Sequence, residues 1–416
     1  MQQPSRDTVA RIAINNAGRE PERLAMKYER MRRSNFAFFR GTAHLFWEDA
    51  GAQRNSIPDA PTVWACGDLH LENFGSYRGA NGLAYFDLND FDEAAVAPAT
   101  WELARLLASI YVAAPSLALD ESGATELAMM FVSSYATALT DGKAQWIERA
   151  TATGIVRKLL RRVKRRSTTT LLESRTVCKG SRRLLRLDNS RSLPLNGVER
   201  ERVFTAFEQH FKTHAEGRLT LLDIARRIAG VASLGLSRYV MLVREKDGPR
   251  SYILLDAKEA RPSSLSAFAL THERAWDSDA DRIVQVQHRM QAVSPARLQA
   301  LTLGNISLTV RQLQPTEDRL VLMTAGHRPR YLGSAIRVLA ETTAWAQLRS
   351  SGREGSATVD ELIAFSRSRH WRTALVTYAR RYQRISARDW RTFGTALDAR
   401  VVELSPAWSR NESSND

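Results

Sequence analysis

The stretch CGDLHLENFGSYRGANGLAYFDLNDFDEA, residues 66–94, predicts a loop followed by a β-hairpin, with acids at both ends. It contains six carboxylates and one Lys or Arg side chain, Arg78, although the whole chain has a formal charge of +15. The six acids are Asp68, Glu72, Asp87, Asp90, Asp92 and Glu93. Carboxylates crowded without cations repel one another unless water, protons or a metal ion neutralises them. The stretch therefore predicts a site that holds something positive.

Local patterns beside this stretch bring its two ends together. TVWACG, residues 62–67, has the pattern of a short buried strand that becomes a loop at Gly67. Asn81 and Gly82 form a hairpin turn, and LAYFDL after them alternates apolar with small or polar residues. WELARLLASIYVAA, which starts at residue 101, has helical periodicity. A hairpin of this kind returns the second group of acids to the first.

The remainder of the chain predicts helices around one β-rich segment. Apolar residues recur at three- and four-residue intervals over 5–50, 122–166 and 333–404, which is typical of helices. Two strand patterns, RYVMLVRE (238–245) and YILLDAKE (252–259), flank the turn KDGP. A helix is expected at 279–293 and a strand at 306–314. The predicted class is α+β and rich in helix.

Length and composition narrow the class of protein. A chain of 416 residues, of which 44% are hydrophobic, exceeds one simple core and predicts two or three lobes. Cys66 and Cys178 match no metal or redox spacing, so free thiols in a reducing compartment are expected. The N-terminus lacks a secretory apolar run, and nowhere do 18 uncharged apolar residues follow one another. We therefore expect a soluble cytoplasmic protein without membrane contact.

Positive charge is concentrated in residues 151–200, which contain fourteen Lys or Arg against three acids. Its centre is RKLLRRVKRR, residues 157–166, where Leu159, Leu160 and Val163 can bury the opposite face of a helix. One interpretation is a solvated helix face. The other is a patch that attracts phosphates, nucleic acid or an acidic partner, without base stacking because no aromatic residue interrupts it.

The loop GDLHLEN places Asp68 five positions before Asn73. Phosphoryl transfer uses a carboxylate that accepts the proton of the nucleophile and an amide oxygen that coordinates Mg²⁺. In the second group, Asp87 and Asp90 stand beside aromatic residues that should be buried, so a metal ion is the better explanation for them. Asp92 also fits a helix N-terminus.

The segments GDLHLEN and NDFDEAAVAPATWELARLLAS resemble the catalytic and metal-binding segments of kinase-like phosphotransferases, especially aminoglycoside and choline kinases. The resemblance implies ATP and Mg²⁺ as cofactors and a small-molecule or protein acceptor. It implies Asp68 as the catalytic base and Asn73 and Asp90 as Mg²⁺ ligands, with Asp87 competing for the place of Asp90. Glu102 would be the acid on the next helix, and His70 would support the loop.

Kinases carry their nucleotide-binding sheet before the catalytic loop, whereas here the matching features follow it. They are the loop GVASLG, with Gly230, Ser233 and Gly235, and Lys258 at the end of the neighbouring strand. The alternatives are a tight turn for the glycines and a surface ion pair for Lys258. We expect a two-lobed, protein-kinase-like fold with a small antiparallel sheet lobe, circularly permuted. Its predicted parts are a catalytic-loop and metal-binding part at 1–150, a basic helical connector at 151–215, a β-rich nucleotide-binding lobe at 216–315, further helices of the other lobe at 316–408 and a disordered tail at 409–416.

The chain also resembles DUF2252, a family of uncharacterised bacterial proteins. The shared segments are NFAFFRG (35–41), CGDLHLENFG, FDLNDFDE, RRIAGVASLG and AKEARPS. Arg40 ends the first of them. An arginine there either binds substrate phosphate or packs its stem at a helix end.

Two other functions stay open. A metal-dependent phosphohydrolase would use the D-x-H of GDLH, although the remaining histidines form no cluster in the sequence. A non-catalytic kinase-like protein would bind nucleic acid or an acidic partner through residues 151–200.

Overall fold

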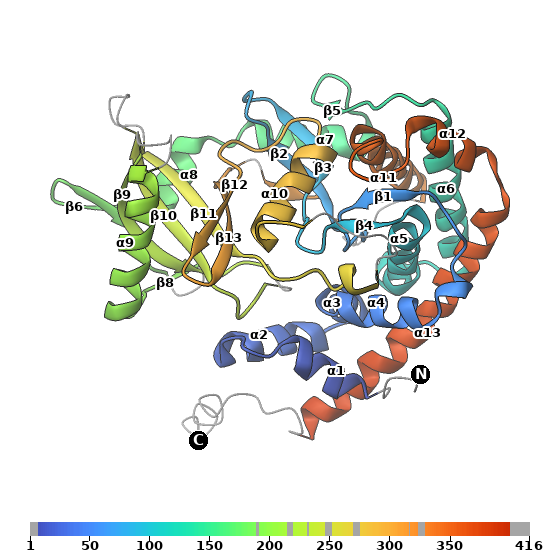
Figure 1. The fold of residues 1–416 in the computed structure, drawn as a ribbon, viewed down its shortest axis with the longest axis horizontal. Coiled ribbons are helices and arrows are strands. Elements are labelled where there is room, and N and C mark those ends of the chain that lie inside the picture. The colour runs from blue at the N-terminus through green and yellow to red at the C-terminus, as the bar shows by residue number, and fades with distance from the viewer. Residues whose placement is uncertain are drawn as a thin grey trace.

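The computed structural model describes residues 7–188, 191–213, 219–230, 233–245, 252–268, 275–315, 317–322 and 329–399. These residues form a mixed α+β structure, with a six-stranded antiparallel sheet at one end and most helices at the other (Figure 1). The α+β class and its richness in helix are confirmed. The predicted turn KDGP and the predicted disordered tail lie outside the described residues.

Four short helices lead into the acidic stretch. They are α1 (Thr8–Asn15), α2 (Pro21–Arg32), α3 (Asn35–Gly41) and α4 (Ala43–Ala52), followed by the 3-10 turn η1 (Arg54–Ser56). Asp7 and Ser34 accept hydrogen bonds from backbone N–H groups at the starts of α1 and α3, and proline is the first residue of α2. The helices expected over residues 5–50 are confirmed for the described part.

Two antiparallel pairings shape the acidic stretch. β1 (Thr62–Ala65) pairs with β4 (Ala95–Pro98), a strand that the sequence did not predict. β2 (Phe74–Arg78) and β3 (Ala84–Leu88) form the predicted hairpin inside a four-stranded sheet of order β14-β2-β3-β5, which β14 (Asp318–Arg319) and β5 (Ile147–Glu148) complete. The loops after β1 and β3 therefore meet at one place.

The helix α5 (Ala99–Ala113) is buried at every position and forms the centre of the helical part. Around it and one another pack α6 (Glu121–Thr140), α11 (Pro329–Ser350), α12 (Val359–Arg367) and α13 (His370–Asp398), while η2 (Ala114–Leu117) ends it. A helix that is enclosed on all sides is apolar nearly all round. The few polar side chains on α5 therefore need partners.

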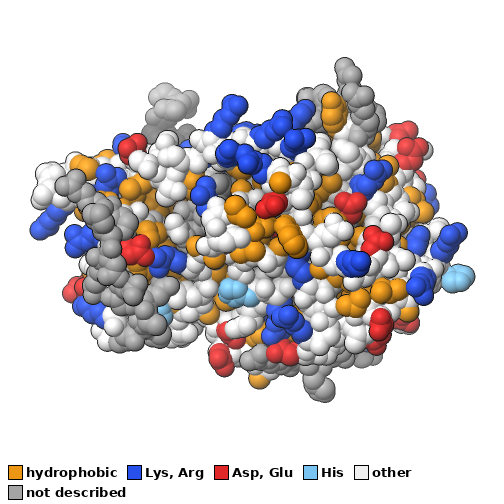
Figure 2. All heavy atoms as spheres, turned by 90° about the horizontal axis from the view of Figure 1, so that it is seen from above, with side chains coloured by type: hydrophobic (Ala, Val, Ile, Leu, Met, Phe, Trp, Pro, Cys, Tyr) orange, Lys and Arg blue, Asp and Glu red, His pale blue; other side chains and the backbone are white. Residues whose placement is uncertain are grey.

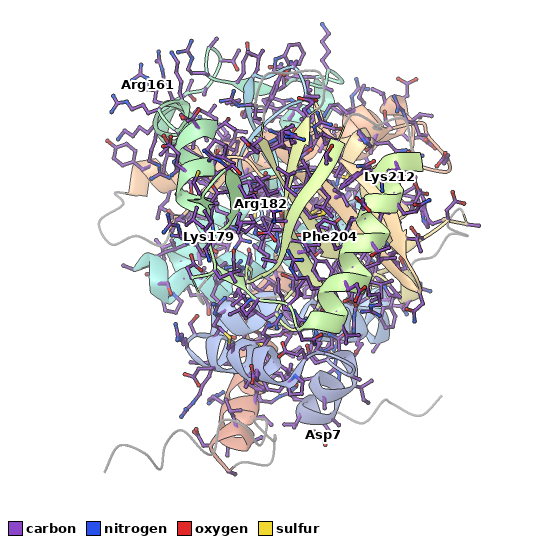
Figure 3. The ribbon with its side chains drawn as sticks, turned by 90° about the vertical axis from the view of Figure 1, so that its left-hand side faces the viewer. Asp7, Arg161, Lys179, Arg182, Phe204 and Lys212 are labelled. Carbon is purple, nitrogen blue, oxygen red and sulfur yellow. The ribbon has the colours of Figure 1, made fainter. Side chains whose placement is uncertain are left out.

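The large sheet has the strand order β12-β13-β11-β10-β9-β8. Its strands are β8 (Ser192–Leu193), β9 (Leu219–Arg227), β10 (Arg238–Glu245), β11 (Tyr252–Glu259), β12 (Gln299–Leu303) and β13 (Ile306–Gln312). Side chains alternate between two cores, so Met241 packs with α9 (Gly197–Thr213), while Leu242 packs with α8 (Thr168–Arg175) and β7 (Arg182–Leu185). Figure 3 views this end of the molecule, with Phe204 and Lys212 on α9. The predicted hairpin of β10 and β11 is confirmed.

The segment 151–215 is not purely a helical connector. Besides α7 (Gly154–Lys164), α8 and α9, it contains the hairpin of β6 (Thr176–Lys179) and β7, and the strand β8. Because β8 pairs with β9, the large sheet starts before the expected boundary at residue 216. The helix α10 (Asp279–Met290), expected from its periodicity, packs against β12 and β13, and η3 (Ser266–Phe268) precedes it.

Both cysteines are free, with Cys66 buried and Cys178 exposed. Among the described residues, every helix is too short or too polar to cross a membrane.

Candidate functional site

A cavity of about 500 Å³ lies where the acidic loops face the large sheet. Its lining comes from α3, both acidic loops, strands β9, β10, β11 and β13, the segment before β10, helix α10, Leu298 and residues 317–321. Of the residues singled out in the sequence, it brings together Arg40, Asp68, His70, Asn73, Asp90, Gly230, Ser233 and Lys258. Asp87, Glu102 and Gly235 do not line it.

The first acidic loop is held by one face of α5. Glu102 accepts hydrogen bonds from the backbone N–H of Cys66 at 2.6 Å and of Gly67 at 3.2 Å. Arg105 donates to Asp68, and the Ser109 hydroxyl accepts from the Leu71 N–H at 3.1 Å. Positions spaced by three and four residues share one face of a helix. Glu102 was singled out in the sequence; the same spacing would have found Arg105 and Ser109, which were missed.

Gly67 and Asn73 hold the two acidic loops against each other. Gly67 has φ +80°, and a Cβ there would lie 1.7 Å from the Glu93 carbonyl oxygen, so only glycine permits this approach. The Asn73 amide donates to the carbonyl oxygens of Asp68 at 3.0 Å and Asp90 at 3.2 Å. Its Oδ1 accepts from the Asp90 N–H at 2.8 Å. Asn73 therefore fixes the spacing of Asp68 and Asp90.

Asp68 is paired with a buried arginine. Arg105, fully enclosed on α5, donates from Nε to Oδ1 of Asp68 at 2.6 Å. Burial raises the pKa of Asp68 to about 7, against the opposing effect of Arg105. A carboxylate with this pKa can accept a proton near neutral pH and release it again.

Lys258 bridges the sheet to the second acidic loop. Its Nζ forms an ion pair with Asp92 and lies 3.9 Å from Oδ1 of Asp90. Burial acts to raise the pKa of Asp90, but the charges of Lys258 and Arg319 and the hydrogen bond from the Asp92 N–H together outweigh it and lower that pKa. The pKa of Asp92 is raised by burial and by the neighbouring Asp90. Asp90, with 40% of its side chain exposed, is thus an ionised carboxylate open to the cavity.

Asp87 lies outside the cavity, and both of its carboxylate oxygens accept hydrogen bonds from protein groups. Its side chain is 3% exposed, and Arg349 donates to Oδ2 at 2.7 Å. The backbone N–H groups of Leu88 and Ala292 also donate to this carboxylate. Of the two acids that competed in the sequence, Asp90 alone faces the cavity.

The crowding of acids in residues 66–94 is relieved mainly by distant side chains. Glu72 pairs with Arg40, and Glu93 accepts from the backbone N–H and the hydroxyl of Ser264. With Arg105, Arg349 and Lys258, these partners engage all six carboxylates. The crowding by itself therefore does not require a metal ion. Arg40 lies in the last turn of α3, where its guanidinium packs 5.8 Å from the centre of the Phe36 ring, and it also lines the cavity, so both interpretations of this arginine stay open.

His70 shapes the first loop. Its Nδ1 accepts from the Glu72 N–H at 3.1 Å, and its ring meets Phe36 edge-on. Burial lowers the pKa of His70 well below its usual value, so the ring is neutral.

The two glycines of the predicted phosphate loop differ. Gly230 lines the cavity at φ +75°, and its carbonyl accepts from Arg30 on α2 at 3.0 Å. A Cβ on Gly235 would lie 2.8 Å from the side chain of Arg19, because this glycine packs on the turn before α2. Ser233 lines the cavity, and its hydroxyl donates to the Ala229 carbonyl at 3.0 Å.

An ion-pair cluster in the sheet was not found from the sequence. Asp256 on β11 accepts from Arg238 on β10 at 2.6 Å and pairs with Arg227 on β9 at 2.5 Å. All three line the cavity, as does Arg311 on β13. These residues carry no local motif, since strand pairing alone brings them together. Among the described residues, the lining has seven carboxylates and six Lys or Arg side chains, so it is close to neutral.

The donor set fits Mg²⁺ carried by a nucleotide. Mg²⁺ keeps several waters and takes one or two protein carboxylates together with phosphate oxygens. Asp90 offers an ionised carboxylate, and Oδ1 of Asn73, a carbonyl oxygen with two acceptor positions, uses one of them for the Asp90 N–H. Within the described parts of the chain, no three His, Cys, Asp or Glu side chains form a metal-binding group.

A basic surface lies on α7, outside the cavity. Its apolar side chains Val156, Leu159, Leu160 and Val163 are buried, as predicted. Its basic side chains face outward in Figure 3, where Arg161 is labelled, and Lys and Arg side chains gather on the upper face in Figure 2. The α7 patch is a surface hollow of about 650 Å³ lined by Arg149, Ala150, Arg157, Arg161, Lys164 and Arg165. Arg162 and Arg166 pair with Asp318.

Comparison with known proteins supports the family resemblance. No curated protein and no solved structure matches the chain. The model of the family described as "Uncharacterized protein conserved in bacteria (DUF2252)" matches residues 19–396. This match includes every residue that lines the cavity around Asp68 and Lys258, and the chain belongs to the DUF2252 family.

Proposed function

We propose that this chain is an ATP- and Mg²⁺-dependent phosphotransferase with a kinase-like, circularly permuted fold, acting on a small-molecule or protein acceptor. The observation that carries the proposal is the meeting of Asp68, Asp90 and Lys258 in one cavity of about 500 Å³. Lys258 is separated from Asp92, its ion-pair partner, by 166 residues. A cavity of this size is in the range of small-molecule and cofactor sites.

Each residue has a separate role in the proposal. Asp68 accepts the proton of the acceptor hydroxyl, since its pKa of about 7 suits a base at neutral pH. Lys258, with the backbone around Gly230 and the Ser233 hydroxyl, binds nucleotide phosphates. Asp90 and Asn73 hold Mg²⁺, which when bound neutralises charge on the phosphates. His70, Glu102 and Arg105 position the loop of Asp68.

The order of elements supports the permuted arrangement. After β8, the large sheet continues with β9, β10 and β11, then come α10 and the strands β12 and β13. A helix therefore separates the third and fourth of the five strands that follow β8 in the chain. Lys258 lies in the third strand, and α10 contributes Ile283 and Gln287 to the cavity. The acid that pairs with Lys258 is Asp92.

Nucleotide binding tests the proposal directly. Mg²⁺ and ATP at a hundred times the dissociation constant should stabilise the protein by roughly 2.7 kcal/mol, which raises the melting temperature by about 3 °C for a chain of this length. Incubation with cell extract and ATP labelled at the γ or the α phosphate then identifies the transferred group. A melting temperature that no nucleotide with Mg²⁺ moves would overturn the proposal. Hydrolysis without nucleotide, with tightly held zinc or manganese, would favour a phosphohydrolase.

The α7 patch favours a second activity, the binding of a polyanion. Arg149, Arg157, Arg161, Lys164 and Arg165 are exposed, and among the described residues none of them has a carboxylate partner. Unpaired cations that share one hollow attract a chain of phosphates or carboxylates. This activity is independent of the cavity of Asp68.

A further inference from the structure

A second, smaller cavity adjoins the large one. Its volume is about 70 Å³, and Arg40, Asp68, Asp90 and Asp92 line both cavities. The other walls come largely from the N-terminal helices, through Asn15, Arg19, Lys27, Gly41, Ala43 and His44. A single water needs roughly 10–15 Å³ of cavity, so the small cavity holds about five non-hydrogen atoms. This is the size of one carboxylate or phosphate group.

Lys27 on α2 brings to this cavity a buried amine that has no carboxylate partner among the described residues. It is 1% exposed, and Nζ donates to the Oδ1 of Asn16 at 2.7 Å. Among the described residues, no carboxylate forms a salt bridge with it. Lysine is almost never fully buried unless it is paired, because removing its charge from water is costly. Burial, reinforced by the charge of Arg19, lowers the pKa of Lys27 well below its usual value.

His44 on α4 adds a polar atom without a hydrogen-bond partner among the described residues. Its side chain is 3% exposed, and its Nε2 atom makes no hydrogen bond to any described residue. A buried polar atom without a partner is rare in a folded protein and needs a reason.

The acids that line the small cavity are engaged by other groups, and the one carboxylate whose charge acts on Lys27 among the leading causes of its pKa shift is Glu93. Asp68 pairs with Arg105, Asp90 and Asp92 surround Lys258, Glu93 accepts from Ser264, and Glu259 accepts from Arg261 and from the Ser237 N–H. A buried lysine without a carboxylate partner and an imidazole nitrogen without a hydrogen bond, in a cavity of this size, are suited to a small anion.

We propose that the small cavity binds the anionic end of the acceptor, a carboxylate or a phosphate group, between Lys27 and His44, and that the acceptor is therefore a small hydroxy acid or hydroxylated phosphate ester. This inference rests on the proposed phosphotransferase activity and specifies its substrate class. Because Asp68 lines both cavities, an acceptor anchored at Lys27 presents its hydroxyl to Asp68 while the nucleotide occupies the large cavity.

The transfer balances with these groups alone. Asp68 takes the hydroxyl proton, the acceptor oxygen forms a bond to the γ-phosphorus, and the bond between that phosphorus and the β-γ bridging oxygen breaks. ADP leaves with the electron pair of that bond, and the proton passes from Asp68 to water.

Anion binding without nucleotide tests the inference. Inorganic phosphate and glycolate are titrated against the full chain by calorimetry and by melting temperature, with ethylene glycol as the uncharged counterpart of glycolate. We expect saturable binding of at least one anion, a rise in melting temperature of roughly one to three degrees, and no effect of ethylene glycol. Lys27→Met should raise the dissociation constant of the anion about ten- to a hundredfold, because this is the usual contribution of a hydrogen bond to a charged group. The same variant should melt higher than the wild type when no ligand is present, because it removes an unpaired buried charge.

Controls separate the inference from a structural role and from the proposed function. Lys143→Met, at an exposed lysine, should leave anion binding unchanged. If Lys27→Met does not fold, His44→Gln takes its place, and this variant should also bind the anion more weakly. Equal anion binding by the wild type and these variants, or a lower melting temperature of Lys27→Met with no change in anion binding, would overturn the inference. If the protein binds the anion through Lys27 but does not bind ATP with Mg²⁺, the phosphotransferase proposal is wrong and the small cavity is an anion site alone.

Discussion

Lys258 at the end of β11 forms an ion pair with Asp92 in the loop after β3, and the two residues are 166 positions apart in the sequence. This pair connects the large sheet to the acidic loop that carries Asp90. The same Nζ lies 3.9 Å from Asp90, so one lysine serves two carboxylates. A cation that already neutralises acids at the cavity wall is placed to exchange part of that interaction for phosphate oxygens.

Replacement of Lys258 by methionine should therefore weaken nucleotide binding. We expect the dissociation constant for ATP with Mg²⁺ to rise about tenfold or more, because a charge-assisted hydrogen bond to phosphate contributes roughly 1.5–3 kcal/mol. Calorimetry measures the constant, with Lys143→Met as the exposed control. If Lys258→Met binds ATP with Mg²⁺ as tightly as the wild type, this lysine does not contribute to the nucleotide site.

Asp68→Asn should separate binding from transfer. The variant is expected to retain nucleotide binding and to lose about 10²–10⁴-fold in kcat, since a base acts on the reaction more than on the ground state. Labelled phosphate transfer and nucleotide calorimetry on the same preparation provide both quantities. A variant that transfers at the wild-type rate would show that another group accepts the proton.

The same residue predicts the pH dependence of the wild type. Because burial raises the pKa of Asp68 to about 7, the unprotonated form that can accept a proton predominates only above that pH. We expect kcat/KM to fall about tenfold per pH unit below pH 7 and to level off above pH 8. A profile that is already level at pH 5 would contradict this role.

Asp90 and Asp87 should respond in opposite ways to replacement by asparagine. Asp90→Asn should remove most of the Mg²⁺-dependent part of the nucleotide-induced rise in melting temperature while changing the ligand-free protein little, because this side chain is 40% exposed. Asp87→Asn breaks a buried pair with Arg349 and should destabilise the protein by about 3–5 kcal/mol without changing the Mg²⁺ dependence. Asp141→Asn, at an exposed acid, is the control. The reverse pattern would assign the metal to Asp87.

The α7 patch should bind single-stranded RNA in a salt-dependent way. Each phosphate contact contributes a slope of roughly −0.7 to a plot of log affinity against log salt. Replacing Arg161 and Arg165 by glutamate should reduce that slope by roughly 1.4 or more, as measured by fluorescence anisotropy with poly(U). Glutamate at Arg384 and Arg391, exposed on α13, tests general charge effects. Equal losses in both double variants would argue against a specific surface.

The periodicity of apolar residues predicted the helices and hairpins whose formation depends on residues close together in the sequence. The helices α5 and α10 and the hairpins β2–β3 and β10–β11 follow from the spacing of apolar residues and from turn chemistry, both of which act within about ten residues. The strands β4, β5, β6, β7, β8, β9, β12 and β14 were not predicted. The short segments β4, β8 and β12 become strands only through pairing with β1, β9 and β13.

The sequence by itself determined which acids and which lysine could form a site, because residue type and loop position set what each group can do chemically. Tertiary structure alone decided that Arg105 holds Asp68, that Arg349 removes Asp87 from the cavity, and that Lys258 meets Asp92. The physical reason is that burial and the distance between charges set the energy of an ion pair, and packing between distant segments controls both.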